Sequence, residues 1–190
     1  GHEVVSVDYS PNLAEKIRSK LFGIADRRQL VAPRLLQSVE ESRPDLFLTL
    51  YGFNVSAEVL ELARDRGAHR VNWWLNDPFQ FERACGILPA YDLAFTNARY
   101  SVDAYRQRGI HNVRYLPTAC EPSVHRPQPA DPGLASEISF AGDWSENREK
   151  IIAKLVAAAF CKVRIFGPWK RKLPRDSALR PLLRDGFFSP

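Results

Sequence analysis

Residues 45–75 encode a strand, a helix and a second strand, in the order DLFLTLYGFNVSAEVLELARDRGAHRVNWWL. The run Asp45–Leu50 is almost continuously apolar, which predicts a strand covered by other elements on both faces. Ser56 begins the helix as its N-cap, and Gly67 ends it before the next strand at His69–Leu75. Two strands joined through a helix in this way predict a parallel pair with a right-handed crossover.

The same alternation extends outward on both sides of this unit. Asn12 and Glu15 form a capping-box pattern that predicts the start of an earlier helix, which Gly23 ends. The repeated alternation predicts an α/β protein with a Rossmann-like, doubly wound parallel sheet. The further predicted elements are strands at 3–8, 91–96 and 113–116 and helices at 29–42 and 98–108.

Proline is frequent between residues 117 and 132, where few apolar residues follow one another. This composition predicts a linker, after which the alternation restarts at Ile138. We expect a first Rossmann-like domain that lacks its first strand, followed by the opening β-α-β of a second, incomplete one. The predicted divisions are a domain at 1–118, a linker at 119–136 and the second domain at 137–190, with strands at 138–142 and 162–166 around a helix at 145–160.

The net charge, the cysteines and the lengths of the apolar runs indicate which classes of partner the protein could bind. The 190 residues carry a net charge of +5 with acidic and basic residues interspersed, which suits an anionic ligand, a phosphate or an acidic membrane surface. We do not expect nucleic-acid binding, and a peripheral membrane contact through Lys170–Lys172 stays open. The three cysteines form no CxxC pair, and no apolar run nears the roughly 18 residues of a membrane span. These observations predict a cytoplasmic protein.

Polar residues and glycines follow several predicted strands. In open parallel sheets, ligands bind beyond the carboxyl ends of the strands. No GxGxxG or GxxxxGKS pattern occurs, so a dinucleotide or P-loop site lacks its main support. The four histidines are scattered, and we expect neither a metal site nor a cofactor. The substrate-binding candidates at these strand ends are Tyr51, Gly52, Trp74, Asn76, Thr96 and Asn97.

The pair Trp73 and Trp74, followed by Asn76 and Asp77, is the most distinctive part of the chain. An aromatic ring and a carboxylate at a strand end could stack on a sugar and hydrogen-bond to it. Alternatively, Asp77 caps a turn before Pro78 while the two tryptophans fill the core. The residues alone leave both interpretations open.

The turn from Gly142 to Arg148 joins a predicted strand to a predicted helix. Gly142 would let a ligand approach the backbone, and the free amides of the helix start beside Arg148 would suit a phosphate. The competing interpretation is that Asp143 or Ser145 caps the helix and leaves Arg148 solvated.

With these residues in hand, the chain resembles the CgeB-type (spore-maturation-like) glycosyltransferases, which have the two-domain GT-B fold. The resemblance covers most of the chain, and the stretches keep the order and spacing of that family. They are Gly1–Val5, Val71–Phe79, Tyr91–Asn97 with Tyr115–Pro117, and Ile138–Gly142 with Asn147–Arg148.

The resemblance implies a metal-independent transfer of a sugar from a nucleotide-sugar donor to an unknown acceptor. It implies that Asn76 and Asp77 lie on the acceptor side, with Asp77 as the candidate catalytic base, and that the donor diphosphate lies near Gly142, Asp143 and Arg148. The first strand and the later acidic residues of such enzymes are absent, and no two glutamates are eight residues apart. We therefore expect this chain alone to be inactive.

Two other functions are compatible with the same residues. The first is a non-catalytic α/β domain that binds a nucleotide or phosphate for regulation. The second is a sugar-processing enzyme of related shape, such as an epimerase or a phosphorylase-like protein.

Overall fold

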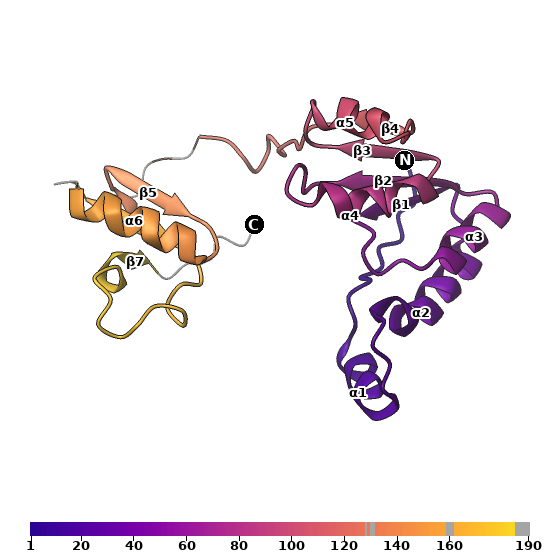
Figure 1. Ribbon diagram of the computed structural model, residues 1–190, viewed down its shortest axis with the longest axis horizontal. Helices are drawn as coiled ribbons and strands as arrows, with labels where there is room; N and C mark the ends of the chain where they lie inside the picture. Colours follow the sequence, from indigo (N-terminus) through magenta and orange to yellow (C-terminus); the bar gives the residue numbers. More distant parts are fainter. Residues whose placement is uncertain (128, 130–131, 159–161, 185–190) are drawn as a thin grey trace. The chain divides into compact units, whose positions relative to one another are not determined.

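The computed structural model describes residues 1–127, 129, 132–158 and 162–184, which belong to two compact units, Gly1–Ala119 and Cys120–Pro190. The first unit contains a four-stranded sheet and the second a three-stranded sheet, and every strand pairing is parallel (Figure 1). Helices alternate with these strands. The predicted α/β class with a Rossmann-like arrangement is confirmed.

The helices of the first unit begin where local capping chemistry places them. Glu15 N donates to Asn12 Oδ1 at 2.9 Å while Asn12 N donates to Glu15 Oε2 at 2.8 Å, which completes the predicted capping box. Ser56 likewise caps its helix by accepting from Val59 N. The elements are α1 (Leu13–Phe22), α2 (Arg27–Ser42), β1 (Leu46–Leu50), α3 (Ala57–Asp65), β2 (His69–Trp74), α4 (Phe81–Cys85), η1 (Leu88–Ala90), β3 (Leu93–Thr96), α5 (Ser101–Gln107) and β4 (Val113–Tyr115).

The second unit is built around one β-α-β crossover. Its three strands follow the order β5-β6-β7, and its core contains Ile152, Ile165 and the completely buried Trp169. The end of the helix predicted at 145–160 lies outside the described residues. The elements are η2 (Pro132–Leu134), β5 (Ile138–Ala141), α6 (Glu146–Ala158), β6 (Val163–Phe166), η3 (Arg180–Leu182) and β7 (Leu183–Arg184).

The strands of the first sheet are neighbours in chain order, β1-β2-β3-β4. Right-handed crossovers that always advance in the same direction place their helices on the same face of the sheet. On that face Phe47 packs in the core formed with α2 and α3, and Trp74, Ala94 and Val113 pack with Tyr105 of α5.

The opposite face of β1 is not covered as the sequence predicted. Leu46, Leu48 and Leu50 alternate onto that face and expose 54%, 52% and 45% of their surface. The prediction from the apolar run was wrong, because the sequential strand order places the crossover helices on the other side. Among the described residues, this leucine row has no covering helix.

The strand predicted at residues 3–8 is also absent. Val4 and Val5 are exposed by 79% and 59%, and this segment pairs with no strand of the described chain. Contacts with the rest of the unit begin at Val7 and Asp8, and Tyr9 adds two hydrogen bonds, since its hydroxyl donates to Leu50 O and its carbonyl accepts from Asn54 Nδ2. The prediction was wrong, because a valine-rich segment becomes a strand only when a neighbour supplies its ladder of hydrogen bonds.

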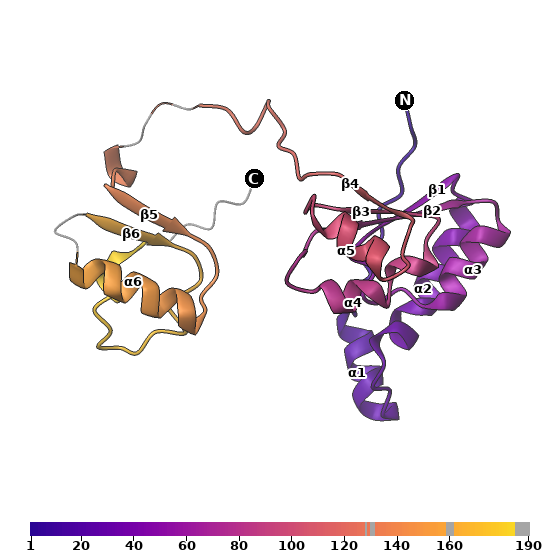
Figure 2. The same cartoon turned by 45° about the horizontal axis from the view of Figure 1, so that its top comes forward.

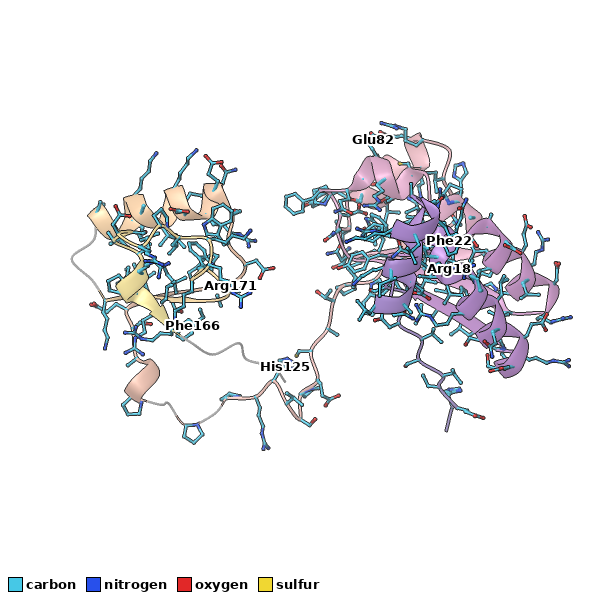
Figure 3. The ribbon with its side chains drawn as sticks, turned by 90° about the horizontal axis from the view of Figure 1, so that it is seen from below. Arg18, Phe22, Glu82, His125, Phe166 and Arg171 are labelled. Atoms are coloured by element: carbon cyan, nitrogen blue, oxygen red, sulfur yellow. The ribbon has the colours of Figure 1, made fainter. Side chains whose placement is uncertain are left out.

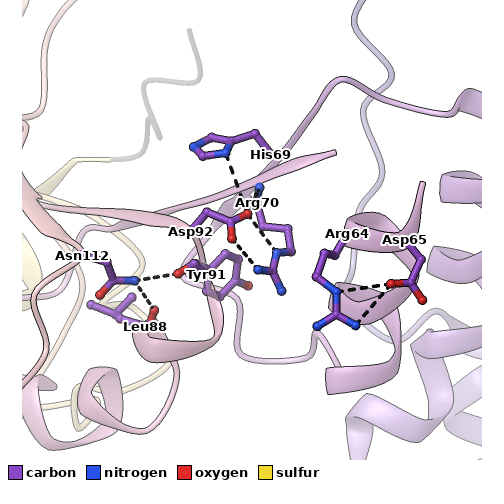
Figure 4. Close-up of polar contacts among 8 residues, drawn as sticks. All are labelled: Arg64, Asp65, His69, Arg70, Leu88, Tyr91, Asp92 and Asn112. Carbon is purple, nitrogen blue, oxygen red and sulfur yellow. Dashed lines mark hydrogen bonds and ion pairs between the residues drawn. The ribbon is translucent and has the colours of Figure 1, made fainter. Parts of the chain in front are cut away.

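An ion pair joins the starts of β2 and β3 (Figure 4). Asp92 accepts from the backbone amide of Arg70 at 2.8 Å and from its Nε at 3.0 Å. The hydrogen bond from the Arg70 guanidinium is the main cause that lowers the pKa of Asp92 from 3.8 to about 2. The contact therefore stabilises the pairing of the two strands when Asp92 is ionised.

We expect this pair to make the first unit sensitive to acid. A carboxyl group whose folded pKa is depressed contributes stability above its unfolded pKa, here near pH 4, and loses it as the pH falls toward 2. Because the Asp92 side chain is 32% exposed, solvent screening reduces the contribution to about 1 kcal/mol. Urea unfolding of the wild type and Asp92→Asn at pH 6 and pH 2 should show a gap at pH 6 that closes at pH 2. An equal gap at both values would contradict the assignment.

Candidate functional site

Asp77 lies at the carboxyl end of β2, inside the first unit. Its residue is only 5% exposed. The hydroxyl of Thr96 donates to its Oδ2 at 2.5 Å, and the hydroxyl of Tyr105 lies 2.9 Å from both carboxyl oxygens. The Asp77–Pro78 peptide bond is cis. The carboxyl group thus connects the end of β2 to β3 and α5.

The register of the sheet explains this meeting. Trp74 is the partner of Thr96 in the parallel pair, so the loop that begins after β2 reaches the end of β3. Thr96 also accepts from Ala98 N at 3.2 Å, which ties the same hydroxyl to the approach of α5. Burial and the hydrogen bond to Asp77 raise the pKa of Tyr105 far above its ordinary value, so this phenol stays protonated and donates.

These contacts give Asp77 a structural role, because they anchor the loop after β2 to β3 and α5. Both of its oxygens already accept from buried hydroxyls, and little of it reaches solvent. A role as catalytic base stays a prediction that these contacts do not test. Tyr105 was not among the predicted residues, because nothing in the sequence around it signals a polar partner 28 positions away.

Trp74 belongs to an aromatic cluster beside this anchor. The residue is completely buried, and the rings of Tyr51 and Phe53 meet it edge-on at centroid distances of 6.0 and 5.2 Å. Arg83 lies over the Phe53 ring at 3.9 Å. The burial of Trp74 agrees with the alternative interpretation for this tryptophan, whereas Trp73 is only partly buried and does not fill the core. The Trp74 ring presents no open face on which a sugar could stack.

Gly52 follows β1 and packs against a buried polar cluster of Thr49, Asn72 and Tyr91. Its φ is +76°, and a Cβ placed on it would lie 2.7 Å from the hydroxyl of Tyr91 and 2.8 Å from Nδ2 of Asn72. Asn72 in turn donates to the hydroxyl of Thr49 at 2.8 Å. The close approach that requires glycine here is therefore to the protein's own side chains.

Three predicted residues are partly exposed at this edge of the sheet. They are Tyr51, Asn76 and Asn97, which follow β1, β2 and β3 respectively. Asn97 Nδ2 donates to Leu75 O at 3.1 Å, while its Oδ1 is buried without a hydrogen-bond partner in the described residues. Because that oxygen is buried, it is an unused acceptor beneath this edge of the sheet and is not open to a ligand.

In the second unit, the turns after β5 and β6 touch each other. Gly142 and Gly167 occupy equivalent positions just after the paired strands, with φ values of +153° and +147°. A Cβ on Gly167 would lie 2.2 Å from Gly142 O. The same carbonyl accepts from Trp169 Nε1 at 2.8 Å, so the two turns rest on a buried tryptophan. The predicted site included Gly142 and missed Gly167.

Arg148 lies beside this glycine pair at the start of α6. Its Nη1 donates to the carbonyl of Asp143 at 2.8 Å, and its guanidinium lies 5.8 Å from the ring of Phe140. Ser145 caps the helix, since its Oγ accepts from Arg148 N at 3.3 Å. Of the two caps that the sequence allowed, the structure therefore uses Ser145.

The polar groups at the start of this helix would suit an anion. The amides of Glu146 and Asn147 have no intrahelical acceptor at these positions. The remaining N–H groups of Arg148 and the positive end of the helix dipole would favour a phosphate in the same place. The carboxylate of Asp143 is exposed, so the part of this residue that organises the turn is its backbone carbonyl.

The other possible sites are weaker. An open hollow in the first unit is lined by Cys85, Arg108 and His111, among others, and includes none of the predicted site residues. Across the described parts of the chain, no group of three or more histidine, cysteine, aspartate or glutamate residues is placed to hold a metal ion.

Comparisons with protein-family models and with curated proteins find no match to this chain. Within the described ranges, none of the helices has the length and apolar character needed to cross a membrane. By its fold, the protein is an α/β chain with two Rossmann-like parallel sheets.

Proposed function

We propose that this chain belongs to a nucleotide-sugar-dependent glycosyltransferase. In this proposal the second unit of the chain binds the donor diphosphate at the turn between β5 and α6. The proposal combines the resemblance to the CgeB-type enzymes with two successive parallel α/β units. In it, the acceptor lies at the carboxyl edge of the first sheet near Asn76 and Asn97. Asp77 stays the predicted base, and its contacts with Thr96 and Tyr105 hold it in place.

One observation carries the proposal: Gly142, Gly167 and Arg148 meet at the amino end of a 13-residue helix. Gly167 lets the carbonyl of Gly142 approach closely, so the two strand ends pack together beside Arg148, where the diphosphate would bind. Arg148 and the helix amides supply charge and hydrogen bonds to a leaving diphosphate, which is what such a transfer needs in the absence of a metal.

We expect the 190-residue chain to bind UDP or GDP in titration calorimetry, with and without EDTA. Arg148→Ala should weaken binding about tenfold or more, because a charge-assisted hydrogen bond to the phosphate is lost. Arg171→Ala, which removes another exposed arginine of the same unit, is the matched control and should change the affinity little. No binding of either nucleotide, or equal losses in both variants, would reject this site.

The alternative of a non-catalytic phosphate-binding domain is supported by the same turn. The two functions differ in what else they recognise. A glycosyltransferase should prefer a nucleoside diphosphate to inorganic pyrophosphate, because base and ribose add contacts. Equal affinity for pyrophosphate would favour the phosphate-binding domain, and titration of both ligands with the wild type separates them.

A further inference from the structure

Helix α1 has its apolar stripe on the side that faces solvent. Leu13, Ile17 and Leu21 are four residues apart and therefore share one face of the helix. They are exposed by 73%, 51% and 74%, and no residue of α1 is buried. In both cartoon views α1 projects from the first unit, away from its sheet (Figures 1 and 2).

The side of α1 that holds the helix in place is polar. Glu15 pairs with Arg34 of α2 at 3.3 Å, and the Glu15 side chain is only 15% exposed. Ser19 lies four residues after Glu15 and donates through its hydroxyl to Ile24 O at 2.6 Å. A helix on the surface of a soluble protein normally turns its apolar stripe inward and its polar face outward. Helix α1 has the reverse orientation within its unit.

Basic residues border the outward stripe on both sides. Lys16 and Lys20 follow Leu13 and Ile17 by three positions, and Arg18 lies on the other flank. In the described part of the chain none of the three forms a salt bridge. Figure 3 labels Arg18 together with Phe22, which is 72% exposed at the end of the helix.

We propose that α1 lies on the surface of an anionic phospholipid bilayer, with Leu13, Ile17 and Leu21 inserted among the acyl chains. An amphipathic helix with basic residues beside an apolar stripe binds such surfaces in the plane of the interface. Lys16, Arg18 and Lys20 contact the phosphate groups, since long basic side chains reach out to the headgroup level. The helix rests on the membrane and does not span it.

The charges and the size of the stripe favour a lipid surface over a second protein chain. A stable protein interface uses about 20–30 residues on each side, which a few side chains of a 10-residue helix do not supply. A bilayer requires no matching shape, and its negative surface potential complements the three unpaired basic side chains.

The test is co-sedimentation of the 190-residue chain with vesicles of phosphatidylcholine alone and with about 30% phosphatidylglycerol. We expect binding to the anionic vesicles, which salt weakens, and little binding to the neutral ones. Ile17→Asp/Leu21→Asp and Lys16→Glu/Lys20→Glu should each reduce binding about tenfold or more. Hydrogen exchange should show α1 amides becoming protected when anionic vesicles are added.

Two matched controls test whether the loss of vesicle binding is specific to α1. Leu46→Asp/Leu48→Asp changes exposed leucines of β1, and Lys154→Glu/Lys170→Glu changes exposed lysines of the second unit. Both should leave binding within about twofold of the wild type. Equal losses in a control, or no binding to anionic vesicles, would overturn the proposal. So would a dimer in light scattering that Ile17→Asp/Leu21→Asp dissociates, because the stripe would then be an interface between copies.

Discussion

Replacing Asp77 by alanine should destabilise the first unit by about 3 kcal/mol or more, whatever its effect on chemistry. The change leaves the hydroxyls of Thr96 and Tyr105 buried without their acceptor, and each unsatisfied group costs about 1–3 kcal/mol. Both donors are completely buried, so water cannot replace the lost carboxyl group easily. Hydrogen exchange in β2, β3 and α5 during urea titration would measure the loss in this unit apart from the second, which contains Trp144 and Trp169.

Two further variants test the anchor from the side of its hydrogen-bond donors. Thr96→Val and Tyr105→Phe each remove one donor and should each cost about 1–2 kcal/mol. Because the three groups form one network, Asp77→Ala in a Tyr105→Phe background should cost less than in the wild type. An Asp77→Ala protein that unfolds at the same urea concentration as the wild type would show that the anchor contributes nothing.

Gly167→Ala should disrupt the second unit, with a loss of about 3 kcal/mol or more. The new Cβ would lie 2.2 Å from Gly142 O, an atom of the backbone that cannot rotate away. The residue also has a φ of +147°, which L side chains rarely adopt, so backbone strain adds to the collision. Hydrogen exchange across residues 138–166 would locate the loss in β5 and β6.

Gly109→Ala is the control that separates strain from collision. Gly109 has a φ of +77°, but a Cβ there would have nothing within 4 Å. Its replacement should cost only about 1–2 kcal/mol, the usual cost of a left-handed conformation. If both variants lose the same stability, the contact between the two turns is less tight than the distance indicates. Backbone strain and the collision with Gly142 O would each weaken nucleotide binding by Gly167→Ala, so binding does not distinguish them.

The starts of α1 and α3 were predictable because capping depends on residues within one turn of each other, whereas the helices predicted from residues 29 and 98 begin at Arg27 and Ser101. Asn12, Glu15 and Ser56 carry that information locally, and each does in the structure what the pattern indicates. Strand coverage was less predictable. The apolar run at 46–50 indicates only that a strand is present, since the covering helices depend on the order of strands in the sheet.

For the candidate site, the positions of residues at strand ends were predictable, but the contacts between them were not. Asp77 and Thr96 could both be placed at strand ends, but their hydrogen bond depends on the register of β2 with β3. Gly167 carried a usable signal, because it follows its strand in the same way that Gly142 follows the preceding one. Tyr105 carried none, since a tyrosine inside a helix is most often an ordinary core residue.

The order β1-β2-β3-β4 also affects how the chain assembles during its synthesis. Each strand pairs with the strand made just before it, and the crossover helix between them is made in the interval. No strand of this sheet waits for a distant segment to leave the ribosome, so loops closed at each step are short. We therefore expect the first unit to grow strand by strand as it emerges, and to fold before residues 120–184 have been translated.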